Sequence, residues 1–200
     1  MTRLQKIEEY VTELLTNEIP EVYYFHNLMH TQHVVMSTAY IGEKEGLTDK
    51  ELELVQVAAW FHDTGFTRMR TGHEEESVKI AEAYLRKHRF EEEDIEVIAA
   101  CIRATKIPQS PKTLLEKILC DSDLTHIASS IYWERSNNLL KEIESCEQIE
   151  IAEIDWLKSN LKFLENHHFF TDFGKARLEV LQLSAIRENR ELIDKLLTDV

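Results

Sequence analysis

The residues best suited to chemistry are an adjacent histidine and aspartate, His62 and Asp63, near the end of an apolar stretch that closes at Gly65. Neighbouring side chains on a helix point about 100° apart, so both polar groups cannot easily reach water if the stretch is buried. Leaving them unpaired in an apolar wall costs roughly several kcal/mol. A cation held by one nitrogen and one oxygen would remove that cost, and it requires further ligands from elsewhere in the chain.

Two other segments contain such ligands. Upstream, His26, His30 and His33 have the i, i+4 and i+7 spacing that would place them on one helical face. Downstream, Asp121 and Asp123 lie in an otherwise apolar stretch. Mixed nitrogen and oxygen ligands suit Mn, Fe, Mg or Zn better than a soft metal. We therefore expect a divalent cation from this group, and the ligand types leave its identity open.

The elements that must position these residues are predicted to be helices, because apolar residues recur at 3–4 spacing and only five Gly and three Pro interrupt them. Thr48 and Glu51 predict a capping box at the start of the helix that carries His62 and Asp63 at its far end. Other helices are expected before Pro20 and over about residues 27–46, 73–88, 91–104, 113–129 and 174–197. No strand pattern is convincing, so we expect an all-α chain.

Composition limits the other function classes. A length of 200 residues suits one domain, and 43% hydrophobic residues are enough for a core. The net charge of −14 opposes binding to a nucleic-acid polymer but permits a small anion at a locally positive metal site. Cys101, Cys120 and Cys146 are expected to be free thiols. Without a signal-peptide region or a membrane-spanning stretch, we expect no membrane association and a cytoplasmic location.

The order of these residues resembles the HD-domain metal-dependent phosphohydrolase superfamily. His62-Asp63 matches the signature pair, and His30 matches the upstream histidine in His-Asn-x-x-His-x-x-x-Val. Asp123, followed by Leu-Thr, resembles the Asp-Leu-Ser of cyclic-nucleotide phosphodiesterases, and Asp121 is its rival. The resemblance covers about residues 24–131. It implies an all-α HD-domain-like bundle, one domain over residues 1–200, with a helical C-terminal extension over about residues 132–200.

The resemblance also implies roles for individual residues. His30, His62, Asp63 and Asp123 would bind a divalent cation, and Asp63 would also orient or deprotonate the attacking water. His26 aligns with the histidine that protonates the leaving oxygen in the cyclic-nucleotide enzymes. A structural role, in which its ring bonds a backbone carbonyl, is an equal alternative.

Five residues have less specific expectations. Arg68, Arg70 and Lys106 lie in predicted loops, where they could hold a substrate phosphate or simply face solvent. His73 could bind metal or begin its helix, and Asp121 could orient a metal ligand instead of binding metal itself. In two-metal relatives, further histidines follow the His-Asp pair on later helices. His73 could be the first of these, but the next is replaced near Thr105. We therefore expect one metal ion.

The function implied is a metal-dependent phosphohydrolase, either a phosphomonoesterase or a phosphodiesterase, that acts on a nucleotide or cyclic nucleotide. One alternative is hydrolysis of another small phosphorylated metabolite. Another is a catalytically silent module for ligand sensing or protein association, although every metal position is filled. The apolar C-terminal helices could pack on the core or on a second copy in a homo-oligomer.

Overall fold

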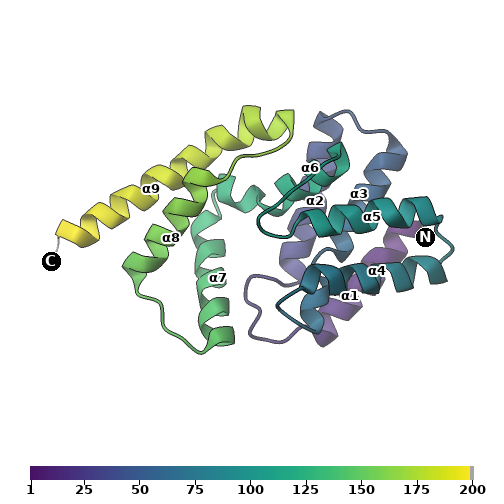
Figure 1. The fold of residues 1–200 in the computed structure, drawn as a ribbon, viewed down its shortest axis with the longest axis horizontal. Helices are drawn as coiled ribbons and strands as arrows, with labels where there is room; N and C mark the ends of the chain where they lie inside the picture. The colour runs from purple at the N-terminus through teal and green to yellow at the C-terminus, as the bar shows by residue number, and fades with distance from the viewer. Residues whose placement is uncertain (199–200) are drawn as a thin grey trace.

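The computed structural model describes residues 1–198, and these residues are all-α, as the sequence predicts. Nine α-helices follow one another along these described residues (Figure 1). They are α1 (Arg3–Glu18), α2 (Leu28–Lys44), α3 (Asp49–Phe61), α4 (His73–Lys87), α5 (Glu92–Ala104), α6 (Leu114–Asp123), α7 (Tyr132–Glu147), α8 (Glu153–Asn166) and α9 (Glu179–Thr198). Three short turns join them: η1 (Thr64–Thr67) and η2 (Thr125–Ala128) are 3-10 helices, and η3 (Gly174–Leu178) is a π-helix.

Side-chain caps determine where several helices begin. Thr48 and Glu51 form the predicted capping box at the start of α3. The Asn27 side chain accepts a hydrogen bond from the backbone N–H of His30, so α2 begins at Leu28. His26 therefore precedes the helix, and the prediction that His26, His30 and His33 share one helical face is wrong for His26.

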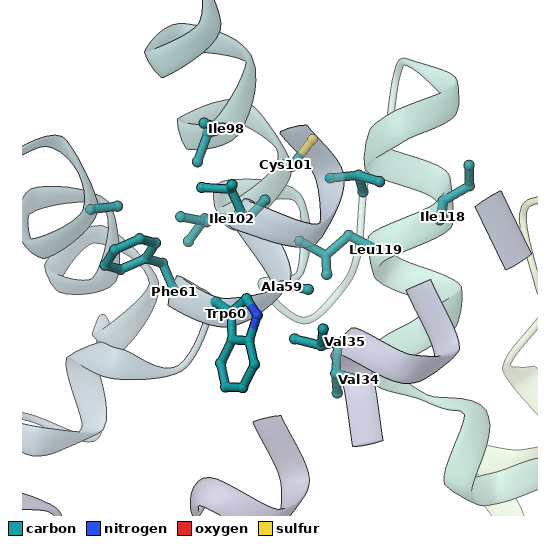
Figure 2. Close-up of a cluster of buried hydrophobic side chains, with 14 of the residues drawn as sticks. Val34, Val35, Ala59, Trp60, Phe61, Ile98, Cys101, Ile102, Ile118 and Leu119 are labelled. Atoms are coloured by element: carbon teal, nitrogen blue, oxygen red, sulfur yellow. The ribbon is translucent and has the colours of Figure 1, made fainter. Parts of the chain in front are cut away.

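Helices α1, α2, α4, α5 and α6 pack around α3. The last turns of α3 are buried on all sides. Residues Val57 to Phe61 are each 4% exposed or less. Figure 2 shows Trp60 and Phe61 of α3 beside Ile102 of α5 and Leu119 of α6. Full burial of each such large side chain contributes roughly 1.5–3 kcal/mol. This core fixes the end of α3, and hence the position of the residues that follow it.

The last three helices form an arm beside the bundle. Figure 1 shows α9 leading away from the bundle to the C-terminal end, with α8 against it and α7 between α8 and the bundle. The arm contacts the bundle through η2, which α7 and α9 both touch. None of the helices within residues 1–198 is long and apolar enough to cross a membrane.

The predicted helix over residues 113–129 is divided in the structure. Helix α6 ends at Asp123, Leu124 leaves helical geometry, and η2 follows. The Ser122 hydroxyl donates to the carbonyl of Ile118, and the Thr125 hydroxyl donates to the carbonyl of Ser122. Such local side-chain bonds compete with a continuing helix. The break places Asp123 at a helix end.

Candidate metal centre and active site

Four predicted ligands meet where three helices end or begin. His30 lies in the first turn of α2, and Asp123 is the last residue of α6. His62 directly follows α3, and Asp63 follows His62 at the start of η1. His30 and Asp63 are 3% and 5% exposed, and His62 is fully buried. The sequence predicted that the imidazole of His62 and the carboxylate of Asp63 would need partners if they were buried. Both are buried, and they lie beside His30 and Asp123.

The distances within this group are short. His30 Nε2 lies 3.0 Å from Asp123 Oδ1 and 3.3 Å from Asp63 Oδ2. His62 Nε2 lies 3.2 Å from Asp63 Oδ2 and 3.6 Å from Asp123 Oδ1. The two Nε2 atoms are 3.4 Å apart. Ligands bound to one ion at about 2.0–2.2 Å are separated by roughly 3–3.6 Å, so the spacing of His30, His62 and Asp123 fits a common cation, with Asp63 beside the two histidines.

The hydrogen bonds around the group also favour a cation. His62 Nδ1 lies 2.7 Å from the carbonyl of Ala59 and donates to it, which leaves the Nε2 lone pair directed at the centre. Asp63 Oδ2 is buried, and no donor within residues 1–198 forms a hydrogen bond with it. Two facing imidazole nitrogens and an unsatisfied carboxylate oxygen repel one another unless a positive charge lies between them.

The pKa shifts have the same electrostatic cause. Burial alone would lower the pKa of His62, but the negative charges of Asp63 and Asp123 close to the ring raise it well above its usual value. The pKa of His30 is raised by the same two carboxylates, against the effect of burial. Burial would raise the pKa of Asp63, yet the two histidines hold it well below its usual range. The carboxylates therefore stay ionised and attract a cation.

Asp121 takes no part in this group. Its Oδ1 accepts from the backbone N–H of Phe170 at 2.8 Å. Its Oδ2 accepts from the backbone N–H and the hydroxyl of Thr171, at 2.9 and 2.7 Å. Asp121 therefore fastens α6 to the segment before η3, and Asp123 is the aspartate that lies with His30 and His62. The alternative in which Asp121 binds or orients the metal is wrong in this geometry.

His26 lies beside the metal group and is held by the C-terminal arm. Its Nδ1 lies 2.5 Å from Glu142 Oε1, and Glu142 Oε2 accepts from the backbone N–H groups of Phe25 and His26. The ring also stacks on Phe66, with centroids 4.2 Å apart. Since Nδ1 bonds a carboxylate and not a backbone carbonyl, the predicted structural alternative is wrong in that form. Nε2 is the ring nitrogen left for a substrate.

Sequence reasoning missed Glu142 and Arg135, both buried on α7. Burial alone would raise the pKa of Glu142, but the hydrogen bonds from His26 and Phe25 lower it below its usual value. Arg135 donates to the carbonyl of Phe25 at 2.9 Å, and its guanidinium lies over the Phe25 ring. A signal did exist, because Arg135 and Glu142 occupy the same apolar stripe of α7 as Tyr132 and Leu139.

Comparison with known families agrees with this geometry. The family model described as the HD domain matches residues 27–128, just over half of the chain. The protein belongs to the HD-domain family. Members of this family bind divalent metals and are generally metal-dependent hydrolases. A search of curated proteins finds no significant match.

Solved structures share the fold over nearly the whole chain, arm included. A protein from Lactobacillus plantarum is 16% identical with a TM-score of 0.70, over 98% of this chain and 95% of its own. Bacillus subtilis YpgQ in complex with ADP is 16% identical with a TM-score of 0.64, over 99% and 98%. A protein from Listeria innocua is 18% identical with a TM-score of 0.63, over 98% and 96%.

In this HD domain, His73 approaches the metal group from α4. Its Nε2 lies 3.5 Å from Asp63 Oδ1, and its Nδ1 lies 3.0 Å from the carbonyl of Arg70. The neighbouring Thr105 is buried and donates its hydroxyl to the carbonyl of Ile102. Within residues 1–198 the ligand atoms that converge form one group, that of His30, His62 and Asp123. His73 is thus placed to contact Asp63, and a single metal stays our expectation.

Of the three residues predicted to bind phosphate, two line a pocket beside the metal group and one does not. Arg70 and Lys106 line a pocket of about 400 Å³ together with His26, Asp63 and Asp123. Arg68 does not line this pocket, since its guanidinium lies 3.0 Å from Glu76 and its side chain is 58% exposed. The expectation that Arg68 holds substrate is therefore corrected. Arg70 also pairs with Glu147 at the end of α7.

Proposed function

We propose that this HD-domain protein hydrolyses a phosphate ester of a nucleotide or cyclic nucleotide with the help of one divalent cation. The observation that carries the proposal is the convergence of His30, His62 and Asp123, with Asp63 beside both histidines and His26 at the edge of the same pocket. When bound, the cation would polarise a phosphoryl oxygen and lower the pKa of water towards neutrality. The remaining tasks fall to side chains of this chain.

Each task has a residue in a suitable place. Asp63 reaches the metal group through Oδ2, and its Oδ1 is directed to the His73 side, where it can orient a water or accept its proton. His26, with Nδ1 committed to Glu142, can deliver a proton from Nε2 to the leaving oxygen. Arg70 and Lys106 provide positive charge for the phosphate in the same pocket.

Two observations support a nucleotide as the substrate class. Bacillus subtilis YpgQ, which shares this fold, was solved in complex with ADP. The pocket of this chain also places two cationic side chains beside the metal group, as a phosphate ester requires. The contact of His26 with a buried carboxylate supports catalysis over a ligand-sensing module, which needs no proton donor.

A substrate screen tests the proposal. Purified protein loaded with Mn, Fe, Mg or Zn is assayed on nucleoside monophosphates, diphosphates and triphosphates, cyclic nucleotides and sugar phosphates. We expect phosphate release from a nucleotide, and loss of that activity by at least about 1,000-fold in His62→Ala. Activity confined to sugar phosphates would support the metabolite alternative. No activity with any ion would support the silent module.

A further inference from the structure

A second cavity, of about 360 Å³, opens between the bundle and the C-terminal arm. It shares His26, Ile107 and Asp123 with the phosphate-side pocket, so the two cavities meet at these residues. Its volume lies within the range of about 300–1,000 Å³ that small-molecule sites occupy. We propose that this cavity receives the base and sugar of a nucleotide, so that α7 and α8 determine which leaving group the enzyme accepts. This inference rests on the proposed function.

The lining of this arm cavity favours a flat ring. Leu139 and Ile143 of α7 and Trp156 and Phe163 of α8 make its wall apolar and aromatic. Its one arginine, Arg135, donates from Nη2 to the carbonyl of Phe25 and lies over the Phe25 ring, while its Nη1 is buried without a hydrogen-bond partner within residues 1–198. A base gains apolar contact with the aromatic side chains of this wall.

A polar group lies on the same wall. Ser136 Oγ accepts hydrogen bonds from Trp156 Nε1 at 3.1 Å and from Asn160 Nδ2 at 3.0 Å. These bonds fix the indole and the carboxamide. The Asn160 oxygen has no hydrogen bond from any residue within 1–198, although Asn160 lines the arm cavity. A carboxamide oxygen accepts from ring N–H or amino groups, which a base has and an alkyl chain lacks.

The position of His26 agrees with a phosphate in the pocket of Arg70 and Lys106 and a base and sugar in the arm cavity. It lines both cavities, and so it lies where a phosphate in one joins a sugar in the other. A proton donor for the leaving oxygen is needed at that junction.

Two variants change the arm cavity while sparing the metal group. Phe163→Ala removes a wall residue that is 38% exposed, and Ser159→Phe fills the cavity from an exposed position. The matched control is Leu183→Ala, which removes an apolar side chain that is 60% exposed on α9 and outside this cavity. Circular dichroism confirms that each variant is folded.

Binding is measured first, in EDTA, with the four ribonucleosides and with hexyl phosphate, by calorimetry and by tryptophan fluorescence. We expect at least one ribonucleoside to bind and to change the fluorescence, with no such change in Trp156→Phe. Phe163→Ala and Ser159→Phe should weaken that binding about tenfold, and Leu183→Ala should leave it unchanged. If no ribonucleoside binds, or if hexyl phosphate binds as tightly as any of them, the assignment is overturned.

Kinetics then separate this inference from the proposed function. With the nucleotide that wild type hydrolyses fastest, Ser159→Phe should raise KM about tenfold. Hydrolysis with an unchanged KM and unchanged nucleoside binding in both variants would overturn the arm cavity as the base site while leaving the proposed function intact. Nucleoside binding without hydrolysis of any phosphate ester would leave the base site intact and overturn the proposed function.

Discussion

At the scale of single residues, the position of His26, the proposed proton donor, depends on a carboxylate from a distant helix. Glu142 accepts three hydrogen bonds from Phe25 and His26, and it is fully buried. It therefore fixes the backbone that carries His26 and the orientation of the ring. This makes Glu142 a positioning residue, because it acts on the reaction only through His26.

Replacing Glu142 tests this role. Glu142→Gln should lower kcat by at least about tenfold and alter the alkaline limb of the pH–rate profile, since a general acid acts only while protonated and a neutral amide orients the imidazole less firmly. The metal content should stay as in wild type. Glu134→Gln, which changes an exposed carboxylate on the same helix, is the control. A lower metal content with an unaltered pH profile would mean that Glu142 has only a structural role.

The sequence was sufficient to predict most of the metal group. It was not sufficient to predict the buried residues of α7 that hold Phe25 and His26 beside that group. His30, His62 and Asp123 have distinctive neighbours, and a buried His-Asp pair demands ligands. Glu142 and Arg135 have a weaker signal, their place on the apolar stripe of α7, because a charged residue on a helix resembles a solvated one unless its stripe is known to be buried. For Arg68 the sequence left a phosphate contact and a solvent-facing position open, and only the packing, in which Arg68 pairs with Glu76, decides for the second.

At the scale of elements, the site depends on a close approach of η1 to α4. Gly65 donates its backbone N–H to the Ser77 hydroxyl at 2.8 Å. A Cβ atom at Gly65 would lie 2.0 Å from the carbonyl oxygen of His73 and 2.9 Å from the N of Ser77. Because both are backbone atoms, neither can move without shifting α4. This approach is what brings His73 to Asp63.

Adding one methyl group measures that constraint. Gly65→Ala should reduce the free energy of unfolding by about 3 kcal/mol, because the backbone must shift. Gly42→Ala is the matched control, since its Cβ would meet Leu52 Cδ1 at 2.7 Å and Leu47 Cδ1 at 3.2 Å, both ends of flexible side chains. Urea unfolding monitored by circular dichroism gives both values. Equal losses in the two variants would refute the account of the η1–α4 contact.

Element boundaries were predictable only where a local signal exists. Thr48 and Asn27 begin helices as expected from their capping chemistry. The break after Asp123 was not predicted, because the apolar pattern continues through residues 124–128 while hydroxyl side chains satisfy the backbone. The start of η3 at Gly174 also depends on a tertiary contact that the sequence does not reveal. A Cβ atom at Gly174 would lie 2.4 Å from Asp121 Oδ2.

At the scale of the whole molecule, the stability of the fold depends on pH through a buried histidine of the arm. His167 directly follows α8, and its Nε2 is buried without a hydrogen-bond partner within residues 1–198. Burial, with a smaller effect from His168, lowers the pKa of His167 to about 4. The unfolded chain takes up this proton near the ordinary value of 6.5. Stability is therefore full above that pH and falls as the pH drops from 6.5 towards 4.

The loss of stability in acid can be assigned with one substitution. His167→Gln should show a smaller decrease in unfolding free energy between pH 7 and pH 4.5 than wild type, because glutamine takes up no proton. His88→Gln, which changes an exposed histidine on the bundle, should decline as wild type does. Identical pH profiles for wild type and His167→Gln would remove His167 as a cause.

The most direct test of the central claim is the metal content of the purified protein, measured by inductively coupled plasma mass spectrometry after dialysis. We predict about one divalent ion per chain in wild type and at least tenfold less in Asp123→Asn and His62→Ala. Asp121→Asn should keep the ion, since Asp121 binds Phe170 and Thr171. A wild type without metal, or an Asp123→Asn variant that retains a full complement, would contradict the account.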